Sequence, residues 1–142
     1  MGAHFIGRFL RRGLNRRGPG DNPLRSAEKA AFEFRMTGDT VIRHIVFFTV
    51  PEENRDAVRK GLSGLTAIPH ALTLEIGENV KKDQWGNSVD FIVYGEFENE
   101  AALAAYKADP AYDLSTRTVK PLRETRVAAD FDSDTAVKAP IR

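Results

Sequence analysis

Four segments of the chain are rich in β-branched and aromatic residues, or alternate apolar and polar positions with a period of two, and both patterns predict β-strands. Residues 41–50 are apolar almost throughout, so we expect a central strand that is buried on both faces for most of its length. Residues 72–77, 90–97 and 125–131 carry the other three strand patterns. The chain therefore has the strands for one four-stranded sheet.

Helical patterns lie between these strands. Residues 53–66 repeat apolar side chains at i, i+4 and i+7, which predicts an amphipathic helix. Asn99 is a favourable N-cap for a second helix over about 101–107. Pro110 breaks that helix, and a short helical piece of about 111–119 follows. The order β-α-β-β-α-β predicts an α+β, ferredoxin-like fold with a four-stranded antiparallel sheet and its helices on one face.

A sheet covered by helices on one face leaves its other face open. In this chain the open face would carry Phe, Val and Ile side chains, and an apolar area of more than a few hundred Å² on a monomer is usually an interface. We therefore expect a homodimer through the sheet face, which makes a dimeric α/β barrel with a two-fold, self-complementary interface.

Charge divides the chain into unlike parts. The first 35 residues hold eight Arg and Lys against three acids, whereas the remainder holds thirteen against seventeen. We take residues 1–36 as a basic, flexible leader, 40–132 as the domain and 133–142 as a polar C-terminal tail. Three interpretations of the leader remain open: a solvated arm, sequence upstream of a start at Met36, or a targeting or anion-binding arm.

Composition excludes several classes of function. A chain with 42% hydrophobic and 29% charged residues is typical of a soluble globular protein, and the absence of Cys excludes disulfides, thiolate catalysis and sulfur-ligated zinc while being compatible with the cytoplasm. No apolar run approaches the roughly 18 residues of a membrane span. No His, Asp or Glu cluster has metal-ligand spacing, the glycines form no phosphate-binding loop, and a short basic arm does not predict a nucleic-acid partner. We therefore expect neither a metal nor a cofactor.

Five short motifs carry a resemblance to a known family. In chain order they are Ile42-Arg43-His44-Ile45-Val46-Phe47-Phe48, Ile68-Pro69, Glu75-Ile76-Gly77, Asp90-Phe91 and Tyr106-Lys107-Ala108-Asp109-Pro110-Ala111-Tyr112. Together they resemble the stress-responsive A/B barrel (Dabb, dimeric α/β barrel) family over roughly residues 41–132. The resemblance implies a small homodimer whose barrel can enclose a hydrophobic pocket. A plant member of that family is a polyketide cyclase that closes a tetraketide by aldol condensation.

The resemblance also implies site residues. The cyclase-type site has a His on the first strand, matched by His44, and a Tyr on the second helix, matched by Tyr106. Its general base is the second His of a His-Pro-Ala-His block, and Tyr112 stands at that position here. A tyrosine hydroxyl, with a pKa of about 10, is a poor general base at neutral pH. The predicted ligand-binding residues are His44, Phe48, Phe91, Tyr106, Asp109 and Tyr112, with His44, Tyr106 and Tyr112 as the catalytic candidates.

Alternatives remain open at these positions. His44 among apolar neighbours is also typical of a structural histidine, and Tyr106 and Tyr112 also fit core packing. Asp109 either ends a helix or pairs with a nearby histidine and raises the pKa of that ring. The sequence favours a homodimer that binds a small apolar or aromatic molecule. The alternative is a cofactor-independent cyclase, lyase or small monooxygenase-like enzyme acting in the pocket, with His44 and Tyr106 as its working pair.

Overall fold

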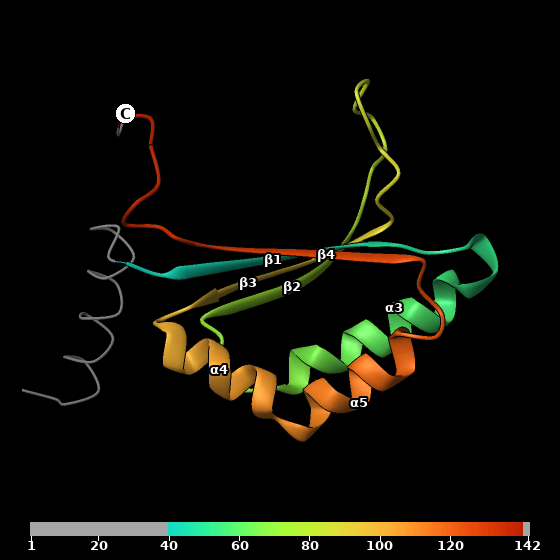
Figure 1. Ribbon diagram of the computed structural model, residues 1–142, viewed down its shortest axis with the longest axis horizontal. Helices are drawn as coiled ribbons and strands as arrows, with labels where there is room; N and C mark the ends of the chain where they lie inside the picture. The colour runs from blue at the N-terminus through green and yellow to red at the C-terminus, as the bar shows by residue number, and fades with distance from the viewer. Residues whose placement is uncertain (1–39, 141–142) are drawn as a thin grey trace, which may run out of the picture. The chain divides into compact units, whose positions relative to one another are not determined.

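The computed structural model describes residues 40–140, and the predicted leader lies outside this range (Figure 1). Its elements follow the predicted order, with short 3-10 turns at both ends of the first helix. They are β1 (Ile42–Thr49), η1 (Glu52–Asn54), α3 (Arg55–Ser63), η2 (Gly64–Ala67), β2 (Thr73–Glu78), β3 (Phe91–Phe97), α4 (Glu100–Ala108), α5 (Pro110–Val119) and β4 (Thr125–Asp132).

The strands form one antiparallel sheet in the order β2-β3-β1-β4, and α3, α4 and α5 all lie on the same face of it (Figure 1). This confirms the predicted ferredoxin-like α+β fold. β1 is central, so its residues have partners on both sides. His44 lies opposite Gly95 of β3 and Asp130 of β4. That register decides which side chains can meet the histidine.

The second and third helices meet at an Asp-Pro pair. Asn99 caps α4 by accepting a hydrogen bond from the Ala102 backbone N–H at 2.9 Å, as expected. Asp109 ends α4 and caps α5 by accepting from the Ala111 N–H at 2.9 Å, while Pro110 occupies the first turn of α5. The proline therefore ends one helix and begins the next, and it directs α5 back across the sheet.

Strand β1 alternates strictly between a covered and an open face. His44, Val46 and Phe48 point into the helix layer and are buried. Ile45 and Phe47 point the other way, and the side chain of Phe47 is 37% exposed. The expected burial of β1 on both faces is therefore not found within one chain, because every helix covers the same side.

Gly95 allows the core beneath the helices to close. It faces the helices directly opposite His44, and a Cβ there would lie 2.8 Å from Cε2 of Phe97 and 3.1 Å from Cδ1 of Leu74. No ordinary side chain fits that close approach. The missing Cβ lets the Phe97 ring lie beside His44, at 6.3 Å between ring centroids.

None of the helices within residues 40–140 combines the length and the apolar character that a bilayer span requires.

Candidate functional site

A small cavity lies between the sheet and the helix layer. Its volume is about 30 Å³, which is room for about two water molecules. Its walls are mainly apolar side chains of β1, β3, α3, η2 and α5, and its polar groups come from β1, β4, α4, α5 and the α5–β4 turn. The residues around it are His44, Val46, Phe48, Leu62, Leu65, Val93, Tyr106, Tyr112, Ser115, Thr116, Val119, Arg123 and Arg126.

His44 is held in one orientation by a carboxylate. Its ring is buried, and Nδ1 hydrogen-bonds Oδ1 of Asp130 from the neighbouring strand. An ionised carboxylate only accepts hydrogen bonds, so Nδ1 carries a proton and donates it. Nε2 has no hydrogen-bond partner among the described residues. A carboxylate-oriented imidazole beside a cavity has the composition of a general base.

Tyr106 presents a buried hydroxyl without a partner. Its side chain is fully buried, and no described residue hydrogen-bonds the hydroxyl oxygen. Its ring packs against His44, Phe97 and Tyr112 at centroid distances of 6.2, 5.0 and 5.2 Å. Burial raises the pKa of Tyr106 far above its usual value, and the neighbouring Tyr112 adds to that rise. The hydroxyl is therefore a neutral hydrogen-bond donor at physiological pH.

The mouth of the cavity is cationic. Nη2 of Arg126 lies 3.5 Å from the half-buried Tyr112 hydroxyl, and the Arg123 guanidinium lies 6.0 Å from the centre of the Phe48 ring. Burial, and then repulsion from Arg126, lower the pKa of Arg123 from its usual value. A site that is apolar at its deep end is thus positively charged where it opens.

Four of the six predicted binding residues lie at this cavity, and they are His44, Phe48, Tyr106 and Tyr112. Phe91 does not, because it is buried beneath the guanidinium groups of Arg55 and Arg59, at 5.2 and 5.6 Å from its ring centre. Asp109 does not either, because its carboxylate caps α5. The carboxylate that pairs with the histidine is Asp130.

Sequence reasoning missed Asp130 and the two arginines. Asp130 is 86 residues from His44 along the chain, so only the β1–β4 register could have identified it. The same register places Arg126 opposite Phe48, on the helix side of the sheet. Within the described part of the chain, no group of three or more acidic or histidine side chains could hold a metal ion.

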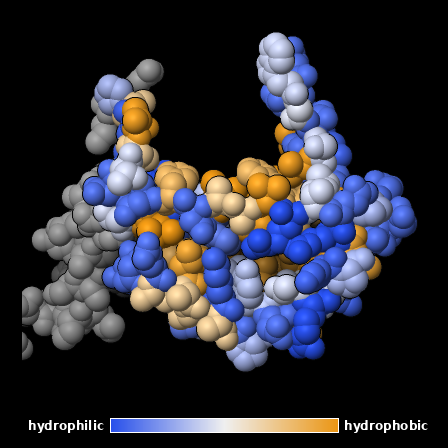
Figure 2. Space-filling model, viewed as in Figure 1, coloured by the Kyte–Doolittle hydropathy of each residue, from blue (hydrophilic) through white to orange (hydrophobic). Residues whose placement is uncertain are grey.

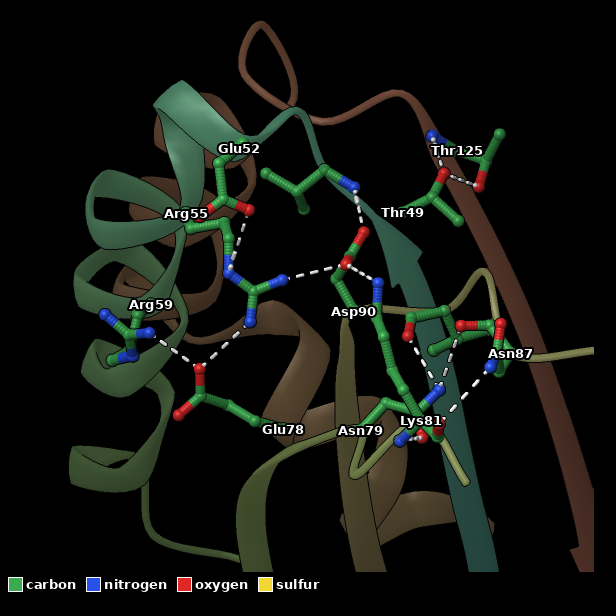
Figure 3. Close-up of polar contacts among 12 residues, drawn as sticks. Thr49, Glu52, Arg55, Arg59, Glu78, Asn79, Lys81, Asn87, Asp90 and Thr125 are labelled. Atoms are coloured by element: carbon green, nitrogen blue, oxygen red, sulfur yellow. Dashed lines mark hydrogen bonds and ion pairs between the residues drawn. The ribbon is translucent and has the colours of Figure 1, made fainter. Parts of the chain in front are cut away.

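A second polar cluster lies at the end of the sheet where the β2–β3 loop begins (Figure 3). Asp90 is buried and accepts hydrogen bonds from Arg55 Nη1, Lys81 Nζ and the Val50 backbone N–H, each at 2.8 Å. Burial opposes its ionisation, but the bonds from Lys81 and Val50 hold the pKa of Asp90 below its ordinary 3.8. Glu78 joins this cluster through Arg55 Nη2 at 3.3 Å, and it also pairs with Arg59 at 2.6 Å. The cluster fixes the base of the 79–90 loop.

The sequence profile of the Stress Responsive A/B Barrel Domain matches residues 42–133, which include every strand and helix described above. The chain belongs to the stress responsive A/B barrel domain family.

Solved structures agree with this membership. A dimeric ferredoxin-like protein of unknown function from Thermobifida fusca is 26% identical over 65% of this chain and 90% of its own, with a TM-score of 0.55. A dimeric ferredoxin-like protein from Bacteroides fragilis is 21% identical over 64% and 94%, with a TM-score of 0.54. A Dabb family protein from Mesorhizobium loti is 22% identical over 66% and 96%, with a TM-score of 0.53. A search of curated proteins gives no significant match.

The ion pairs of Asp90 predict how the stability of the fold depends on pH. Because the pKa of Asp90 is lowered on folding, its carboxylate stabilises the fold above pH 3.8, and this contribution is lost as the pH falls through the lowered value. We expect Asp90→Asn to reduce the free energy of unfolding at pH 7 by about 1–3 kcal/mol. Urea denaturation over a pH series should show that difference shrinking below about pH 4.

Asp113→Asn is the matched control, since Asp113 pairs with Arg117 on an exposed helix surface and should matter little. A difference between wild type and Asp90→Asn that stays constant down to pH 3 would show that the cluster does not depend on the Asp90 charge.

Proposed function

We propose that this family member is a homodimer, joined through the open faces of two sheets, and that the cavity of each protomer binds a small apolar or aromatic molecule bearing one oxygen acceptor. The observation that carries the ligand is the Tyr106 hydroxyl, which is fully buried and without a partner in residues 40–140. Leaving a hydroxyl buried and unpaired costs about 1–3 kcal/mol. A bound oxygen acceptor would remove that cost.

The ligand would enter past the polar side chains at the mouth. A cavity of about 30 Å³ is smaller than an aromatic ring, so binding requires the mouth to widen. Tyr112 is half-buried and Arg126 is exposed. Exposed side chains change rotamer within nanoseconds, so these two residues can move without unfolding a helix or strand.

The open sheet face supports the dimer. Phe47, Val127 and Phe131 remain 37%, 61% and 38% exposed on it. Figure 2 shows hydrophobic side chains gathered on this side of the domain, between two projecting segments. Fully burying each large apolar side chain is worth about 1.5–3 kcal/mol, so pairing two such faces is favourable. The solved relatives from T. fusca and B. fragilis are described as dimeric.

Two segments border this face. The 79–90 loop and residues 133–140 both project on the side of the sheet away from the helices (Figure 1). The Asp90 cluster anchors the loop at its base. At the other end, Ser133 is tied to Val41 by hydrogen bonds of 2.9 Å in both directions. A partner sheet would therefore lie between two anchored borders.

A second candidate function is catalytic, and the His44–Asp130 pair favours it. In a cofactor-independent cyclase or lyase, His44 Nε2 would remove a proton next to a ligand carbonyl. Tyr106 would donate a hydrogen bond to the oxygen that becomes the enolate. The base in this scheme is His44 and not Tyr112, whose hydroxyl lies at the mouth beside Arg126.

Dimerisation can be tested with a charge on the open face. Phe47→Glu should convert the dimer to a monomer at micromolar concentration, because two carboxylates would be buried at a two-fold interface. Sedimentation velocity measures this directly. Leu114→Glu, on exposed α5, is the control and should stay dimeric. A wild-type protein that sediments as a monomer would refute the dimer.

Ligand binding can be tested with acetophenone, a neutral aromatic ketone, followed by NMR titration. Tyr106→Phe should weaken its affinity roughly 2- to 10-fold, the value of one neutral hydrogen bond. Tyr94→Phe is the control, because the Tyr94 hydroxyl bonds Glu96 on the open face. Equal affinities for wild type and Tyr106→Phe would remove Tyr106 from the site.

The catalytic candidate can be tested separately, by hydrogen–deuterium exchange at a ligand carbon. In D₂O, a general base at His44 should accelerate exchange of the acetophenone methyl protons for deuterium, because enolisation releases and restores a proton at that carbon. His44→Ala should abolish the acceleration. If wild type leaves the exchange rate unchanged, the enzyme candidate fails while ligand binding remains.

A further inference from the structure

We infer that the ligand of the cavity is a carboxylate: its charged group is bound at the mouth by Arg123 and Arg126, and its apolar body enters the cavity toward Tyr106. This inference rests on the proposed ligand-binding function and specifies the chemical class of the ligand.

Three of the six arginines within residues 40–140 are paired with carboxylates. Arg55, Arg59 and Arg117 bond carboxylates of Asp90, Glu78 and Asp113 at 2.8, 2.6 and 2.9 Å. A fourth arginine, Arg43, lies over the Phe131 ring on the open sheet face, at 5.5 Å.

Arg123 and Arg126 differ from those four. They line the cavity, which the other four do not, and like Arg43 they have no carboxylate within ion-pair distance among the described residues. The polar contact of Arg126 is the Tyr112 hydroxyl at 3.5 Å, which is long for a hydrogen bond. Two unpaired cations therefore stand together at one opening.

Their mutual repulsion is a reason to expect an anion. Arg123 is half-buried, and burial together with the nearby Arg126 lowers its pKa, so its charged form is less favourable there than in water. A carboxylate would compensate both charges at once. Guanidinium groups bind carboxylates with paired N–H···O bonds, so the match is geometric as well as electrostatic.

The surroundings favour a monoanion over a phosphate. The cavity wall includes Val119, the last residue of α5, and the C-terminal end of a helix carries partial negative charge. That end repels a dianionic phosphate more strongly than a carboxylate.

The Tyr106 hydroxyl is an independent indication of a ligand. It lies at the buried end of the same cavity, and it needs an acceptor that no described side chain supplies. The cavity thus combines a buried donor, an apolar wall with Val46 and Val93, and two cations at the mouth. A small carboxylic acid whose apolar body carries a second oxygen acceptor at its far end has the complementary order of groups.

The test uses two matched probe pairs, benzoate with benzamide and hexanoate with hexanamide, titrated calorimetrically. Each pair shares its apolar body and differs in the charge of the head group. Wild type should bind each acid about 10-fold more tightly than its amide, the value of a charge-assisted hydrogen bond. Arg126→Gln and Arg123→Gln should each reduce the ratio of acid to amide affinity toward one. Arg117→Gln, whose arginine is paired on the outside of α5, should keep it.

The possible failures are distinguishable. If acids and amides bind wild type equally, or if the Gln variants keep the preference, the carboxylate inference is overturned while the proposed ligand site stands. Tighter binding of phenyl phosphate than of benzoate would also overturn it. If neither acetophenone nor any of the four probes binds, the proposed function itself fails, and the inference fails with it.

Discussion

All three helices pack against the same face of the sheet, because β1 and β3 alternate buried and exposed side chains along their length. Because the helices cover only one face, the two faces of the sheet differ in chemical character. The helix side encloses the aromatic core, the His44–Asp130 pair and the cavity. The other side leaves an apolar surface to water, which a second copy would cover. The proposed ligand binding and dimerisation would therefore use opposite faces of the same four strands.

The cavity depends on strand register as much as on its residues. Gly95 stands opposite His44 and leaves the space that the Phe97 ring fills, so the histidine packs in a closed aromatic cluster. On the other side of β1, the register brings Asp130 to the same ring. A slip of one residue would turn Asp130 to the open face and leave His44 without its carboxylate.

The elements could be predicted because their signals are local. Asn99 caps α4 through a backbone N–H three residues away, and the apolar spacing of 53–66 is visible within two turns. The site could be predicted only in part. His44 and Tyr106 were predicted, but Asp130 reaches His44, and Arg126 reaches the cavity, through the pairing of β1 with β4, which no local pattern encodes. Asp109 is a helix cap, and its carboxylate bonds the Ala111 backbone N–H and not a histidine.

Phe48 and Phe91 show the same limit. They are partners in the β1–β3 register and face the same side, so the sequence gives no reason to separate them. Tertiary packing does so: two guanidinium groups from α3 cover Phe91, while Phe48 lies beside Arg123 at the cavity. The residues packed over each ring therefore decide whether it lines the cavity.

A crystal structure of the full chain, grown with benzoate, tests the central claim most directly, because it reports the partner and the ligand together. The account predicts a two-fold dimer joined through the open sheet faces, with benzoate between the two arginines and the Tyr106 hydroxyl. A monomer whose sheet faces solvent, or a Tyr106 hydroxyl bonded to another group of the protein with the cavity closed, would contradict it.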